Sequence, residues 1–136
     1  FNEEPVIAET YKRLKKVMDE IGEPYELIFI NDGSSDRTGE ILDEIHHQDR
    51  NLKVIHFARN FGHEAATTAG LDHALGQGIV IIDADLQDPP ELIPAMIEKW
   101  KEGFDVVYGK RKQRKGESVF KKTTSALFYR FLQRMT

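Results

Sequence analysis

The sequence predicts an α/β fold in which helices cover a parallel sheet. Four short apolar runs, at 25–30, 52–57, 79–82 and 104–109, alternate with segments whose apolar residues recur every three or four positions. The run at 79–82 is Ile-Val-Ile-Ile, too short for a helix and typical of a strand buried on both faces. Polar residues follow these runs, so we expect a ligand site at the carboxyl edge of the sheet.

Amphipathic helices are expected before and between these strands. The first has one apolar face and stops before the turn residues 22–24. That face consists of Ile7, Thr10, Leu14, Val17 and Ile21. Later helices are expected around 41–45, over about 63–75 and over 92–100. Because a strand normally precedes the first helix of such a wrap, we also expect the natural protein to have a strand upstream of Phe1.

Length and composition limit the class of protein. A chain of 136 residues with 40% hydrophobic content is the size of one domain. It has no cysteine, which excludes disulfides and thiolate metal sites. No signal peptide is recognisable and no apolar run approaches the ~18 residues of a membrane span, so a cytosolic setting fits the sequence.

The charges are divided unevenly along the chain. Residues 1–109 carry 10 Lys and Arg against 22 Asp and Glu, whereas residues 110–136 carry 9 against 1. The basic end predicts an anionic partner, and the acidic remainder argues against nucleic acid. Residues 118–136 have an aromatic and leucine-rich stripe bordered by basic side chains, which suits a helix at a membrane interface or one packed on the domain. We therefore divide the chain into a domain at 1–117 and this helix at 118–136.

The strongest functional signal directly follows the apolar run at 79–82. Asp83, Asp85, Gln87 and Asp88 stand in one short segment before Pro89-Pro90. Carboxylate and amide oxygens are hard ligands that suit Mg²⁺ or Mn²⁺ held jointly with a diphosphate. The alternative is that Asp83 and Asp88 only cap the next helix, which would leave the other two polar residues unexplained.

Two further candidates follow other predicted strands. Asp32 stands beyond the strand at 25–30, where it could accept hydrogen bonds from a nucleobase or ribose, or could equally cap the following helix. Arg59 could bind a diphosphate or form an ion pair with Glu64. The five histidines have no metal-ligand spacing, and we expect them to be structural.

Four motifs, taken together, resemble glycosyltransferase family 2. They are FNEE at 1–4, INDGSSDRT at 30–38, RNFG at 59–62 and DADLQDPPE at 83–91. Within the family they are most similar to the polyprenyl-phosphate glycosyltransferases, and the resemblance covers essentially the whole chain. It implies a GT-A fold, a Rossmann-like sheet flanked by helices, and inverting sugar transfer from a UDP- or GDP-sugar.

The resemblance also implies roles for individual residues. Asp85 and Gln87 match the metal ligands of the DxD motif, and Asp83 matches an acid that assists metal and nucleotide. Glu3 and Asp32 match nucleoside contacts, and Arg59 remains a donor-binding candidate. Basic residues past 109 match phosphate and acceptor contacts, and these are Arg111, Arg114 and Lys122.

The implied acceptor is a polyprenyl phosphate, undecaprenyl or dolichyl, at the cytoplasmic face of a membrane. Such an acceptor is already an anion, which agrees with a site that has no poised histidine. The alternatives are a saccharide hydroxyl acceptor, for which Asp88 would be the candidate base, and a non-catalytic nucleotide-binding fragment. A homo-oligomer is also compatible with the sequence.

The chain departs from the family at both ends. The family's first strand, central to its sheet, is missing before Phe1, so we expect an opening in the core and an incomplete wall of the nucleotide pocket. Many relatives continue beyond the interfacial helix into transmembrane helices, so we expect this chain to be either a soluble piece of such an integral enzyme or a short variant that only touches the membrane peripherally.

Overall fold

A computed structural model describes residues 1–110. The helices are α1 (Ile7–Ile21), α2 (Thr38–Gln48), α3 (His63–His73) and α4 (Ile93–Lys101), the strands are β1 (Leu27–Asn31) and β2 (Leu52–His56), and a short 3₁₀ helix η1 (Pro90–Leu92) precedes α4. All four expected helices are therefore confirmed, as are the strands expected at 25–30 and 52–57, with small shifts at their ends.

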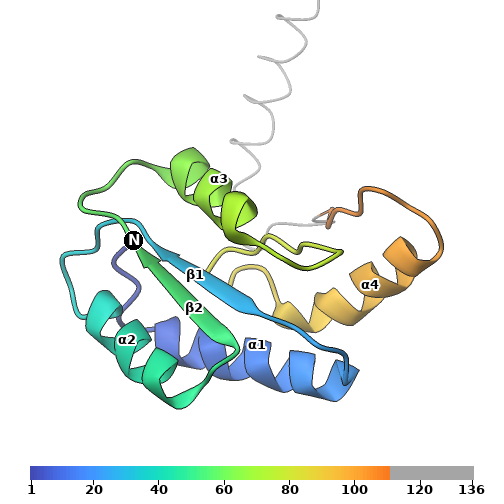
Figure 1. The fold of residues 1–136 in the computed structure, drawn as a ribbon, viewed down its shortest axis with the longest axis horizontal. Helices are drawn as coiled ribbons and strands as arrows, with labels where there is room; N and C mark the ends of the chain where they lie inside the picture. The colour runs from blue at the N-terminus through green and yellow to red at the C-terminus, as the bar shows by residue number, and fades with distance from the viewer. Residues whose placement is uncertain (111–136) are drawn as a thin grey trace, which may run out of the picture.

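The two strands form a parallel sheet with helices on both sides. Leu27 of β1 lies opposite Leu52 of β2, and the register continues to Asn31 opposite His56. Figure 1 shows α1 and α2 on one side of the strands and α3 on the other. Helix α3 packs on β1, where Gly70 lacks the Cβ that would lie 3.7 Å from Cγ1 of Ile30. The predicted α/β architecture, a parallel sheet flanked by helices, is thus confirmed.

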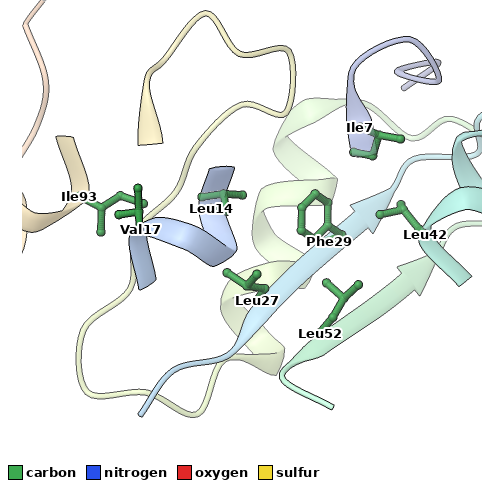
Figure 2. Close-up of a cluster of buried hydrophobic side chains, with 8 residues drawn as sticks. All are labelled: Ile7, Leu14, Val17, Leu27, Phe29, Leu42, Leu52 and Ile93. Carbon is green, nitrogen blue, oxygen red and sulfur yellow. The ribbon is translucent and has the colours of Figure 1, made fainter. Parts of the chain in front are cut away.

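The hydrophobic core fills the space between the sheet and α1, α2 and α4. Burial alternates along β1, because successive side chains point to opposite faces of the sheet. Figure 2 shows Leu27 and Phe29 of this strand among buried side chains of the surrounding elements. The cluster comprises Ile7, Leu14, Val17, Leu27, Phe29, Leu42, Leu52 and Ile93. The cluster holds α1, α2 and α4 against the sheet, and so supports the segments that follow β1 and β2.

The strands expected at 79–82 and 104–109 are not formed, and those two predictions are wrong. A strand requires a neighbour that pairs with its backbone N–H and C=O groups. In the described part of the chain β1 pairs only with β2. The other side of β1 faces a cavity of about 1280 Å³, which Ile28 and Ile30 line together with residues 79–82. Without an adjacent backbone, 79–82 forms no strand, and Ile81 is 58% exposed.

This cavity borders β1 on the side where a further strand would pair with it. The strand expected upstream of Phe1 stays a prediction. The proposed boundary at 117 and the helix at 118–136 lie outside the described residues. Within residues 1–110, no helix has the length and apolarity required to cross a bilayer.

Candidate functional site

Four of the predicted site residues line the same cavity. Glu3, Asp32, Asp83 and Asp85 come from the N-terminal segment, the end of β1 and the segment after 79–82. Arg59 and Gln87 stand outside the lining. The same cavity is therefore lined by acids that are up to 82 positions apart in the sequence, and it also extends to Tyr25 and Glu26 before β1.

Asp32 joins the end of β1 to the beginning of α3. Its Oδ1 accepts a hydrogen bond from the Phe61 backbone N–H at 2.7 Å, and its Oδ2 accepts one from Gly62 at 3.0 Å. The side chain is only 6% exposed. Both N–H groups belong to residues just before the first residue of α3, and neither α2 nor α3 has a side-chain cap, so the capping alternative for Asp32 is wrong and the carboxylate instead ties the segment before α3 to the end of β1. Each carboxylate oxygen keeps a second lone pair for a further donor.

The backbone after Asp32 touches the backbone after β2. Gly33 has φ +64°, and a Cβ at this position would lie 2.3 Å from the carbonyl carbon of Arg59. Only glycine permits this approach. The Arg59 guanidinium carbon lies 4.6 Å from the centre of the Phe61 ring, a cation–π contact, and Arg59 forms no ion pair with Glu64 among the described contacts.

A buried amide fixes the turn that follows β1. Asn31 Oδ1 accepts a hydrogen bond from the Ser34 N–H at 3.1 Å, and Asn31 Nδ2 lies 3.0 Å from Nδ1 of His56. Nε2 of the same imidazole lies 3.0 Å from Oδ1 of Asp43. His56 therefore has the structural role that the sequence predicted for it.

The N-terminal segment is bound to the polar turn at 31–38. Glu3 N–H donates to Thr38 Oγ1 at 2.8 Å, and Glu4 N–H donates to Asp36 Oδ2 at 3.1 Å. Burial alone would raise the pKa of Asp36, but hydrogen bonds from Thr38 and from the Glu4 backbone bring that pKa below its ordinary value. The FNEE and NDGSSDRT motifs therefore depend on each other, because backbone N–H groups of the first donate hydrogen bonds to side chains of the second.

The acidic segment forms a tight turn. Asp85 Oδ1 accepts a hydrogen bond from the Gln87 N–H at 2.9 Å, and Leu86 has φ +62°, in the left-handed region. Asp83 is exposed, and its Oδ1 lies 3.9 Å from Nδ1 of His63 at the start of α3. Sequence reasoning missed His63, although its place directly after RNFG at the end of a strand was a usable signal.

Among the described residues, the predicted oxygen ligands Asp85 and Gln87 are an incomplete set for a metal, and of the two only Asp85 lines the cavity. In the described chain, no group of three or more His, Cys, Asp or Glu side chains is arranged to hold a metal by itself. Mg²⁺ in nucleotide sites usually takes one or two carboxylates together with phosphate oxygens and water, so a complete protein cage is not required. Asp85 and Gln87 can supply such a partial set. Arg111, Arg114 and Lys122 lie outside the described residues.

Comparison with known proteins gives a match along the entire chain. Residues 1–136 match the family model described as Glycosyl transferase family 2. The chain is 63% identical over 136 residues to an uncharacterized glycosyltransferase, YkcC, of Bacillus subtilis (strain 168). This alignment covers 100% of the present chain and 42% of YkcC.

Two further relatives are more distant. The chain is 43% identical over 136 residues to an uncharacterized glycosyltransferase, sll0501, of Synechocystis, covering 100% of this chain and 43% of that protein. It is 44% identical over 130 residues to a prophage bactoprenol glucosyl transferase homolog of Escherichia coli (strain K12), covering 96% of this chain and 42% of that protein. The chain therefore spans about two fifths of the length of these relatives.

Proposed function

The chain belongs to glycosyl transferase family 2, and on that premise we propose that its full-length protein transfers a sugar from a nucleotide-sugar to a polyprenyl phosphate at a membrane surface. The observation that carries the proposal is the convergence of Asp83 and Asp85 with Glu3 and Asp32 on one cavity. The lipid acceptor is supported by relatives named bactoprenol glucosyl transferase, at 43–44% identity.

Family 2 enzymes generally use a divalent metal. We propose that Asp85 and Gln87 would hold Mg²⁺ or Mn²⁺ together with the donor diphosphate. When bound, such an ion neutralises charge on the departing nucleoside diphosphate. Asp83, exposed beside His63, would add negative charge for binding the ion.

Other residues of the chain bind and orient the donor in this proposal. Glu3 is placed by its backbone bond to Thr38, and Asp32 by its bonds to Phe61 and Gly62. The remaining lone pairs of Asp32 would accept hydrogen bonds from N–H or O–H groups of the nucleoside. The guanidinium of Arg59, held over Phe61 at the same edge, would approach the diphosphate.

The reaction follows from the charges of the two substrates. An acceptor phosphate oxygen attacks the anomeric carbon, the bond from that carbon to the diphosphate oxygen breaks, and the nucleoside diphosphate leaves with the bonding electrons. The acceptor is already an anion, so no base has to remove a proton. On the resemblance alone, Arg111, Arg114 and Lys122 are our candidates for its phosphate, and 118–136 for the membrane contact.

A transfer assay on the full-length protein tests this proposal. Membranes containing the protein are incubated with radiolabelled UDP- and GDP-sugars, undecaprenyl phosphate and Mn²⁺. We expect label in the lipid fraction, reduced at least about 100-fold by Asp85→Ala, because loss of a metal ligand removes the charge stabilisation. Asp72→Ala, at an exposed acid of α3 outside the lining of the cavity, is the matched control. Equal labelling in Asp85→Ala would refute the metal assignment, and label in a saccharide product instead would indicate a hydroxyl acceptor.

A further inference from the structure

Helix α1 holds the acidic segment at two points. The Thr10 hydroxyl donates a hydrogen bond to the carbonyl oxygen of Ala84 at 2.8 Å, across 74 positions of sequence. One turn further along, Arg13 forms a two-pronged ion pair with Glu91, with Nε to Oε1 at 3.0 Å and Nη2 to Oε2 at 2.6 Å. Residues three apart share a face of a helix, so one side of α1 contacts both ends of the segment 84–91.

The two contacts differ in how much solvent reaches them. Thr10 is 1% exposed, whereas the side chains of Arg13 and Glu91 are 31% and 54% exposed. An ion pair this accessible contributes little, because water and salt screen it. A hydrogen bond from a buried hydroxyl has no solvent to replace it, so its loss leaves the carbonyl without that donor. Thr10 is therefore the firmer of the two contacts.

The carbonyl that Thr10 holds belongs to the residue between the two acids. Ala84 packs against the hydrophobic core, while Asp83 and Asp85 on either side line the cavity. Fixing the Ala84 carbonyl fixes the plane of the peptide that leads into Asp85. From there the bond between Asp85 Oδ1 and the Gln87 N–H, with Leu86 in the left-handed region, sets the remainder of the turn.

We propose that Thr10 is a positioning residue, whose hydroxyl orients the segment 83–87 so that Asp85 and Gln87 face a shared divalent cation. The inference rests on the proposed function, since it assumes that this segment holds the ion. Thr10 lies on the helix face that otherwise carries Ile7, Leu14 and Val17, and an aliphatic residue would serve packing equally well. The hydroxyl is required for its hydrogen bonds, of which the one to Ala84 is the contact with the acidic segment.

The chain contains a matched control on another helix. Thr10 Oγ1 also lies 3.0 Å from the Val6 carbonyl oxygen, four residues earlier, and Thr68 of α3 makes the same contact to the Glu64 carbonyl oxygen at 2.9 Å. Thr68→Val removes a helical hydroxyl with this local bond, but no bond to the acidic segment. Thr10→Val removes both, with nearly the same shape, and Thr10→Ser keeps the hydroxyl.

The experiment measures Mn²⁺ binding to the full-length protein with UDP, and in parallel with GDP, by the loss of the electron paramagnetic resonance signal of free Mn²⁺. We expect Thr10→Val to weaken Mn²⁺ binding about 10-fold, as changes behind a metal ligand commonly do, and Thr10→Ser to restore most of it. Thr68→Val should bind as the unchanged protein does. Hydrogen exchange at the Gln87 amide should accelerate in Thr10→Val alone.

Two results would overturn the inference, and they are distinguishable. If the unchanged protein binds Mn²⁺ but Thr10→Val binds it equally well, Thr10 has only a packing role and the proposed function stands. If the unchanged protein binds no Mn²⁺ with either nucleotide, the metal assignment fails and the positioning role fails with it. A fall in unfolding free energy without a change in Mn²⁺ affinity belongs to the first case.

Discussion

Replacing Asp32 should destabilise the fold before it affects any ligand. The carboxylate connects two segments, because it is buried after β1 and accepts the backbone N–H groups of Phe61 and Gly62. Asp32→Ala removes both acceptors and leaves the start of α3 without them. Asp32→Asn keeps one acceptor oxygen but turns an amide NH₂ toward the other N–H, so one of the two bonds is lost.

The size of the effect follows from the two bonds. A hydrogen bond to a charged group is worth about 1.5 to 3 kcal/mol net. Both bonds are part-buried, so water can recover part of each when the carboxylate is removed. We therefore expect a loss of about 2 to 3 kcal/mol for Asp32→Ala and about 1 to 2 kcal/mol for Asp32→Asn. For a domain of ordinary stability, about 5 to 15 kcal/mol, this is a substantial fraction.

Urea denaturation followed by circular dichroism measures the free energy of unfolding of each variant. Asp72→Asn, an exposed acid on α3, is the control and should stay within about 0.5 kcal/mol of the unchanged protein. Nucleotide affinity is measured separately, at a temperature where each variant is folded. A loss below about 0.5 kcal/mol in Asp32→Ala would refute the reasoning, because it would mean that the carboxylate does not hold the two segments together.

Three further predictions concern the core, pH and the open side of the sheet. Leu42→Ala should cost about 2 to 5 kcal/mol in urea denaturation, because Leu42 is 1% exposed in the core. Burial and the hydrogen bond to Asp49 raise the pKa of Tyr11 to about 12, so from pH 10 to 12 the unfolded chain loses a proton that the folded chain keeps. Stability should fall by about 1 kcal/mol across this range after allowance for solvent screening, and less in Tyr11→Phe. Extending the chain with a strand of the kind expected upstream of Phe1 should raise the melting temperature, because a strand beside β1 would fill the cavity.

Each of these has a contradicting outcome. A cost below about 1 kcal/mol for Leu42→Ala would mean that the core closes around the change. Identical alkaline profiles for the unchanged protein and Tyr11→Phe would remove Tyr11 as the cause, leaving Tyr25, whose pKa is also raised by burial and by its bond to Asp19. An extended chain that melts no higher would show that the cavity is not a place for a strand.

Periodicity along the sequence predicted the helices well because each buries a local stripe. The face of α1 was identified correctly, including Thr10, but nothing local indicates that its hydroxyl reaches Ala84. The run at 79–82 was predicted as a strand from its composition, yet a strand also depends on a neighbour that local sequence cannot supply.

The candidate site shows the same division between local and distant information. The acidic motif was evident from spacing, the place of Asp32 at the same edge followed from the α/β rule, and Glu3 was a candidate only through the family resemblance. The two roles left open for Asp32 depend on the distance to Phe61, which no sequence pattern encodes. The place of His63 directly after RNFG was a usable signal, but its distance to Asp83 was not encoded locally.

Gly33 has a consequence for how the site can vary and move. Since a Cβ there would collide with the Arg59 backbone, a library randomised at this codon should return glycine alone among active clones. The same contact makes the two connecting segments behave as one body. A nucleotide that displaces one of them would carry the other along, so Asp32 and Arg59 should report a bound donor together, with shared changes in their nuclear magnetic resonance spectra.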